Sequence, residues 1–448
     1  MKKLLALILS LLLCLPCIPA RADETLTIVH ATDMHFLSPA LTDYGESFME
    51  IIEGADGKVT HYTPQIMQAF VDEMLMLLPD AIILSGDLTL NGAKQSHTDL
   101  IKILQPLTEA GIQVLALPGN HDTNTAGYQF TGNQVTLVDG IEDADFDDLY
   151  AAFGYDDALS RDTASMSYVA ELSPKVWCLL VDVNANGTSG TALDETLLWM
   201  EAQLARAQRE GITVIAVSHH PAIVHNGMFT FGYVVSNNTK LLSLYRQYGV
   251  SLSLSGHLHM QHITSSHDTL EIAASSLAVA PNQYGILTAN GNQLIAYETK
   301  PLDVAGWATR TGQDDPNLLN FAAYSSEFFN RNTYGSVQAM LAGSSISAEE
   351  QQLLTDFVVT LNAQYFAGKR TITAEDPAWA LWQKYFTGSF FTEYIDSMLC
   401  ERARDMCTVT FLPARSKAAI IPSACRIEEG ARRKLALPAL TPSLSKRY

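Results

Sequence analysis

LPGNHD, residues Leu117–Asp122, follows an apolar run that begins at Ile112, and this predicts a buried strand that ends in a tight loop. The Pro-Gly pair breaks the strand and turns the backbone. An amide, an imidazole and a carboxylate therefore come in succession at one strand end. Alone, such a loop is an ordinary polar turn, so its meaning depends on what the other strands carry.

Four other apolar runs end in the same kind of chemistry. These runs are Leu26–Val29, Ala81–Leu84, Ile212–Val217 and Val250–Leu254. The polar groups that follow them are Asp33-Met34-His35, Gly86-Asp87, His219-His220-Pro221 and Gly256-His257-Leu258-His259. In an open α/β sheet, ligands bind at the carboxyl ends of the strands, so we expect these side chains to gather at one rim. Oxygen and imidazole ligands without thiolates suit Mn²⁺, Fe or Zn²⁺.

The order of these motifs resembles that of the calcineurin-like metallophosphoesterase superfamily over residues 28–259. The resemblance implies an α/β fold, an α/β/β/α sandwich of two mixed sheets, with two divalent metal ions (Mn, Fe or Zn). It also implies hydrolysis of phosphate esters by a hydroxide that bridges the ions. The Asp-x-His-Phe start and a helical C-terminal extension are similar to exported bacterial class III cyclic-nucleotide phosphodiesterases. Leu90 stands where purple acid phosphatases carry a tyrosine, so a coloured Fe(III) site is not expected.

The same resemblance implies a role for each polar side chain. The predicted ligands are Asp33, His35 and His259 for the first ion, Asn120, His219 and His257 for the second, and Asp87 as the bridge. His121 would face the phosphate, where it would stabilise the transition state or protonate the leaving oxygen. Asp122 would orient His121 from behind.

Two further histidines stay open from sequence alone. Adjacent strand residues point to opposite faces, so only one of His219 and His220 can be a direct ligand unless the backbone turns sharply. The resemblance places the ligand at His219. His225 follows closely enough to be a candidate for lining the substrate pocket.

Several other classes of function are disfavoured. The chain has neither a Gly-x-Ser-x-Gly nucleophile element nor a Gly-x-x-x-x-Gly-Lys phosphate loop. A formal net charge of −20 disfavours a nucleic-acid polymer as the main partner, so a small phosphate ester is the expected substrate. We expect a phosphodiesterase. The alternatives are a phosphomonoesterase of the nucleotidase or acid phosphatase type and a cell-envelope binding protein with a vestigial site.

The ends of the chain carry their own signals. Met1-Lys2-Lys3, an apolar run over Leu4–Leu15 and Ala20-Arg21-Ala22 predict a signal peptide over residues 1–22. Twelve apolar residues are short for a membrane span of about 20, so no transmembrane span is expected in the mature chain. We therefore expect a secreted or cell-envelope protein.

The rest of the chain divides into segments that differ in hydrophobic periodicity and composition. Residues 23–302 alternate strands and helices, typical of βαβ units, and would form the phosphoesterase domain. Within them, the stretch from Asp33-Met34-His35 to His61 is expected to be a long polar loop. Residues 303–406 show helical periodicity and would form a helical C-terminal domain. Residues 407–448 are basic and are expected to be a poorly ordered tail.

Overall fold

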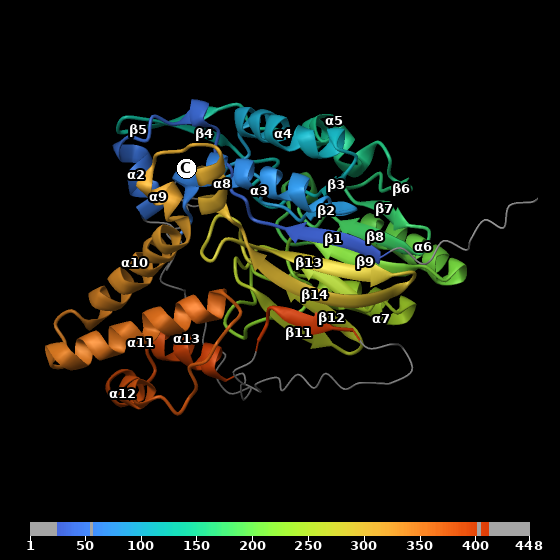
Figure 1. Ribbon diagram of the computed structural model, residues 1–448. Helices are drawn as coiled ribbons and strands as arrows, with labels where there is room; N and C mark the ends of the chain where they lie inside the picture. The colour runs from blue at the N-terminus through green and yellow to red at the C-terminus, as the bar shows by residue number, and fades with distance from the viewer. Residues whose placement is uncertain (1–24, 54–56, 401–404, 412–448) are drawn as a thin grey trace, which may run out of the picture.

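The computed structural model describes residues 25–53, 57–400 and 405–411 (Figure 1). The predicted signal peptide and most of the predicted tail lie outside these ranges. Among the described residues, no helix is both long and apolar enough to cross a membrane.

The first sheet carries three of the predicted strand-end motifs. Its strands lie in the order β15 (Thr408–Thr410), β14 (Gln293–Pro301), β13 (Gln283–Asn290), β1 (Thr25–Ala31), β2 (Ala81–Leu84), β3 (Gln113–Ala116). β1 pairs in parallel with β2, β2 pairs in parallel with β3, and β13 joins β1 antiparallel. The carboxyl ends of β1, β2 and β3 therefore meet at one rim.

The second sheet carries the other two motifs. Its order is β11 (His262–Ser266), β12 (Thr269–Ala273), β10 (Leu252–Ser255), β9 (Thr213–Ser218), β8 (Val176–Val181), β7 (Tyr168–Ser173), β6 (Ser160–Arg161). β8, β9 and β10 run parallel. Residues of β8 alternate between two apolar clusters: Cys178 belongs to the core between the sheets, and Trp177 and Leu179 to the outer cluster beneath the helices. This alternation is the period of two expected of a strand buried on both faces.

Helices cover the outer faces of both sheets, and the predicted α/β/β/α sandwich is confirmed (Figure 1). The helices of this part are α2 (Glu46–Glu53), α3 (Thr63–Leu77), α4 (Lys94–Glu109), α5 (Asp143–Leu149), α6 (Asp194–Glu210) and α7 (Asn238–Tyr248). α6 and α7 end at Gly211 and Gly249, each in the left-handed conformation that a helix C-terminus favours. A small hairpin of β4 (Gly127–Thr131) and β5 (Gln134–Val138) follows the LPGNHD loop.

Two expectations for irregular chain were wrong. The predicted loop before His61 contains α2, whose Phe48 and Ile52 are buried at helical spacing. At the start of the predicted tail, β15 extends the first sheet by pairing with β14, and Cys407 is buried. A strand of three residues carries too little periodicity to be recognised in the sequence.

The C-terminal helices divide between two apolar clusters. They are α8 (Val304–Arg310), α9 (Pro316–Leu319), α10 (Phe321–Leu341), α11 (Ala348–Phe366), α12 (Pro377–Phe386) and α13 (Phe390–Leu399). α8, α9 and the start of α10 share the core of the sandwich through residues such as Trp307 and Phe321. The end of α10 and α11–α13 form a separate cluster, the helical layer, that extends from one side of the sandwich (Figure 1).

Candidate metal centre

Five of the predicted ligands share an unusual backbone conformation. Their φ angles lie between +43° and +66°, in the left-handed region that non-glycine residues seldom adopt. The residues are Asp33, His35, Asp87, His257 and His259. Strain of this kind persists where the surrounding fold enforces it and is concentrated at functional sites.

The first group of side chains combines two strand ends of the first sheet with one of the second. Single ligand atoms of Asp33, His35, Asp87 and His259 lie within 4.8 Å of one another. His259 Nε2 is 3.4 Å from Asp33 Oδ1 and 3.0 Å from His35 Nε2. All but His259 are buried, and Asp33 Oδ1 has no hydrogen-bond partner among the described residues. Two carboxylates and two imidazoles at this spacing fit a divalent cation.

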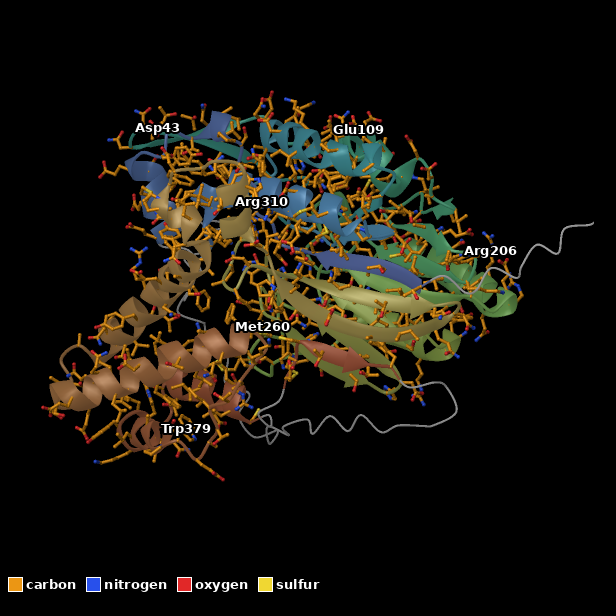
Figure 2. The ribbon with its side chains drawn as sticks, in the orientation of Figure 1. Asp43, Glu109, Arg206, Met260, Arg310 and Trp379 are labelled. Carbon is orange, nitrogen blue, oxygen red and sulfur yellow. The ribbon has the colours of Figure 1, made fainter. Side chains whose placement is uncertain are left out.

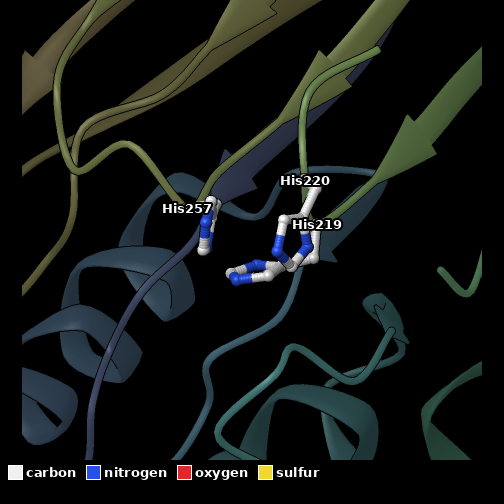
Figure 3. A group of neighbouring side chains, drawn as sticks. All are labelled: His219, His220 and His257. Carbon is white, nitrogen blue, oxygen red and sulfur yellow. The ribbon is translucent and has the colours of Figure 1, made fainter. Parts of the chain in front are cut away.

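The second group consists of His219, His220 and His257, whose rings converge at the ends of β9 and β10 (Figure 3). His219 Nδ1 lies 2.9 Å from the Ser85 carbonyl oxygen. Because a carbonyl oxygen only accepts, Nδ1 carries a proton, and Nε2 is the nitrogen whose lone pair can bind a metal in the neutral ring.

His220 joins this group, which the rule for strand residues allowed only if the backbone turned sharply here. The chain bends at His219 and His220, directly after β9 ends at Ser218, so the two rings are not forced to opposite faces. The His220 and His257 ring centroids are 3.8 Å apart. Neither ring nitrogen of His220 has a hydrogen-bond partner among the described residues.

Asp87 lies between the two groups. Its Oδ1 is 3.3 Å from His219 Nε2, and its Oδ2 is 3.8 Å from His35 Nε2. Burial opposes charge on both partners, but the Asp87 carboxylate raises the pKa of His219 to about 9, while His219 holds the pKa of Asp87 well below its usual range. Asn120 Oδ1 is buried and has no hydrogen-bond partner among the described residues, as expected of a metal ligand.

His121 stands at the side of this centre, half-exposed, with Nε2 4.0 Å from Asp87 Oδ2. Its Nδ1 lies 2.8 Å from the Leu90 carbonyl oxygen, so that carbonyl orients the ring.

The structure adds a charged residue, Lys58, that was not singled out from the sequence. Burial lowers the pKa of His121, Asp87 raises it, and the Lys58 ammonium lowers it. Burial, and after it the Lys58 ammonium, also lower the pKa of His35, so the Lys58 charge acts on this site; no motif in the sequence marks it.

The expectation that Asp122 orients His121 was wrong. The buried Asp122 carboxylate instead accepts hydrogen bonds from the backbone N–H groups of Leu88, Thr89 and Gly119 and from the Thr89 hydroxyl, at 2.8–3.0 Å. These donors come from the loops after β2 and β3. Asp122 therefore ties together the two loops that carry Asp87 and Asn120.

The structure likewise does not bring His225 into either group. Its side chain is buried, with Nδ1 3.0 Å from His262 Nδ1 and Nε2 3.5 Å from Glu271 Oε2. Glu271 also accepts from the backbone N–H groups of Ala222 and Ile223. His225 thus belongs to a buried polar cluster with His262 and Glu271. Its closeness in sequence to His219 could not reveal these partners.

Two glycines allow the loops to approach closely. A Cβ at Gly119 would lie 2.2 Å from Asp87 Oδ1, and one at Gly256 would lie 2.0 Å from Thr32 Oγ1 and 2.6 Å from Asp33 Oδ2. No real Cβ atom tolerates such contacts. Glycine is required at both positions because the backbone touches the ligands of the centre.

The sandwich, with carboxylates, an amide and imidazoles gathered at its strand ends, defines a class of metal-dependent hydrolases. This chain belongs to the calcineurin-like phosphoesterase family, whose model matches residues 26–261. Residues 303–405 match the family described as the C-terminal domain of cyclic nucleotide phosphodiesterase. The resemblance seen in the sequence is thereby confirmed.

A relative found by sequence agrees with this assignment. A probable cyclic nucleotide phosphodiesterase from Rhodococcus erythropolis is 25% identical over 182 residues, which are 40% of this chain and 52% of that protein. The chain thus spans about half the length of this relative.

Solved structures with a similar fold include a dimetal phosphatase from Danio rerio, at 13% identity and a TM-score of 0.44, covering 61% of this chain and 95% of that one. Another is a purple acid phosphatase from yellow lupin, Lupinus luteus, at 12% identity and a TM-score of 0.41, covering 62% and 52%.

Proposed function

We propose that the protein is a phosphodiesterase that uses two divalent ions, Mn, Fe or Zn, and acts on small phosphodiesters, with cyclic nucleotides as the favoured class. One observation carries the dinuclear centre: the two oxygens of Asp87 face two separate groups of imidazoles, at 3.3 and 3.8 Å. A single carboxylate between two ligand sets is what a pair of ions requires.

The residues present fit such a pair. Asp33, His35 and His259 would hold one ion, Asn120, His219 and His257 the other, and Asp87 both. When bound, divalent ions supply positive charge that polarises the phosphoryl group and lowers the pKa of water. His121, held by the Leu90 carbonyl and open to solvent, would bind the phosphate or move a proton at its Nε2 atom.

The match of residues 303–405 to the C-terminal domain of cyclic nucleotide phosphodiesterase favours a diester as the substrate. The test is a substrate panel on protein reconstituted with Mn²⁺, Fe²⁺ or Zn²⁺. We expect higher kcat/KM for bis-p-nitrophenyl phosphate and cyclic nucleotides than for p-nitrophenyl phosphate. Preference for the monoester would make it a phosphomonoesterase, and metal-loaded protein without turnover would indicate a binding protein.

Asp87→Asn tests the dinuclear centre directly. One carboxylate neutralises and joins both ions, so we expect loss of activity and of bound metal beyond the roughly 10–100-fold typical of changes outside the ligand shell. Metal analysis after gel filtration gives the stoichiometry. Two ions retained with normal turnover would contradict the assignment.

We further propose that the protein acts outside the cytoplasmic membrane after cleavage of residues 1–22. The basic start, the short apolar run and Ala20-Arg21-Ala22 support this proposal. The net charge of −20 supports a small substrate over a nucleic-acid polymer.

A further inference from the structure

The loop over residues 219–235, between β9 and α7, touches the candidate centre at both ends. It begins with His219 and His220, and near its other end the Gly232 carbonyl oxygen lies 3.0 Å from His257 Nε2. Because a carbonyl only accepts, this contact places the His257 proton on Nε2 and leaves the Nδ1 lone pair for a metal. The loop thus supplies ligands and also orients a ligand from the neighbouring strand end.

The middle of this loop is fastened to the helical layer. Asn226 is 5% exposed, and its Nδ2 donates to Tyr365 Oη of α11 at 2.9 Å and to Ser397 Oγ of α13 at 3.1 Å. Its Oδ1 accepts from the Met228 backbone N–H at 2.9 Å. Phe229 then lies edge-on to Tyr394 of α13, with ring centroids 6.0 Å apart. A buried amide with these bonds fixes where the loop crosses the helices.

The strand end that carries His257 is attached to the same helices. Leu258 and Met260, which alternate with the two motif histidines, belong to the apolar cluster of the helical layer, and Met260 lies at the junction with the strands (Figure 2). The backbone N–H of Gln261 donates to the Phe366 carbonyl at the end of α11, at 2.9 Å. Both segments that supply the second group of histidines are therefore supported from the helical layer.

We propose that the helical layer holds His219 and His257, ligands of the second ion, in the positions that metal binding needs. Asn226 is the positioning residue, and it acts through Gly232 and His257. The inference rests on the proposed two-ion centre. In the first group, Asp33, His35 and Asp87 come from the ends of β1 and β2, and only His259 comes from the strand end that the helical layer supports. Loss of the Asn226 contacts should therefore weaken one of the two ions selectively.

The test compares Asn226→Ala with Asn362→Ala by Mn²⁺ titration calorimetry of the metal-free full chain. Asn362 is a matched control: it is 7% exposed and bonds Thr333 and Tyr394 at 2.9 and 2.5 Å, within the C-terminal helices. Its link to the loop is indirect, through the Tyr394 ring beside Phe229. In Asn226→Ala we expect one of the two ions to bind about 10–100-fold more weakly. Asn362→Ala should keep both affinities while losing similar thermal stability.

A second variant guards against misfolding of Asn226→Ala. Tyr365→Phe removes one acceptor from the helix side, and the same ion should bind more weakly, by a smaller factor. Unchanged affinities in both variants, or an equal loss in Asn362→Ala, would overturn the inference. The wild-type stoichiometry separates the two proposals, because fewer than two ions there would refute the two-ion centre itself.

Discussion

At the scale of residues, the centre depends on atoms that the fold leaves unpaired or strained. Asn120 Oδ1 and Asp33 Oδ1 are buried without partners among the described residues, and five predicted ligands have left-handed backbones. Each feature costs free energy in the folded chain without metal. A bound ion would repay part of that cost, so ligand binding and stability are coupled.

His121→Ala tests the role of the one predicted catalytic imidazole. Metal content should stay at the wild-type level, since Nδ1 of His121 is held by Leu90 and its Nε2 is 4.0 Å from the nearest Asp87 oxygen. The kcat should fall by about 10²–10⁴, the usual contribution of a positioned acid or base. The loss should be larger for alkyl-type esters such as cyclic nucleotides than for aryl esters, because p-nitrophenolate leaves without a proton.

Steady-state kinetics on both ester types measures this difference. Equal losses on both would assign His121 to phosphate stabilisation without proton donation. Loss of an ion would make it a metal ligand.

Gly256→Ala tests the close approach beside Asp33. The added Cβ would lie 2.0 Å from Thr32 Oγ1, so the loop and the Asp33 carboxylate must separate. We expect weaker metal binding and lower activity. Gly335→Ala is the control, because a Cβ there meets no atom within 4 Å, and within α10 it should be neutral or stabilising by up to about 1 kcal/mol. Normal metal affinity in Gly256→Ala, measured by titration, would refute the constraint.

At the scale of elements, the site is a property of loops that hold one another. Asp122 joins the loop after β2 to the loop after β3 through four donors. The loop over residues 219–235 joins the end of β9 to the end of β10 and to the helical layer. These cross-links, and not the strands alone, keep the ligands in register.

Asp122→Ala should destabilise the fold and the site together. It leaves buried donors unpaired at about 1–3 kcal/mol each, so the free energy of unfolding should fall by about 3 kcal/mol or more. Denaturant unfolding measures this, and Thr89→Val, which removes one of the four donors, should cost less. A loss of activity without a loss of stability would instead restore a direct catalytic role for Asp122.

At the scale of the whole molecule, the C-terminal region comes back into contact with the sandwich after its helices. β15 pairs with β14, and the Thr299 backbone N–H of β14 donates to the Cys407 carbonyl at 2.9 Å. The helices between these points share cores with the sandwich at α8 and at Leu258 and Met260. The C-terminal region therefore supports the sandwich by direct contact.

Cleavage of the proposed signal peptide should leave the sandwich and the C-terminal region intact. The mature chain should begin near Asp23, which precedes the start of β1 at Thr25. N-terminal sequencing of protein from the cell-envelope and medium fractions measures this. Recovery of an intact Met1 in the cytosol would refute export.

The sequence by itself determined the alternation of strands and helices and the rim where ligands gather, and its resemblance to a known family implied the sandwich. Apolar runs and the residues that end them are local signals, and parallel strands bring such ends together. The polar groups after β1, β2, β3, β9 and β10 could therefore be placed at one centre, and the structure brings them there.

Only the tertiary structure decided which distant partner each polar group has. Asp122 binds two loops and not His121, His225 faces Glu271, and Asn226 reaches helices more than a hundred residues away. A local pattern reports burial and periodicity, whereas a hydrogen bond depends on where remote backbone and side chains arrive. For the same reason, the sequence could not predict the effect of Lys58 on the site or the packing of Leu258 against the helical layer.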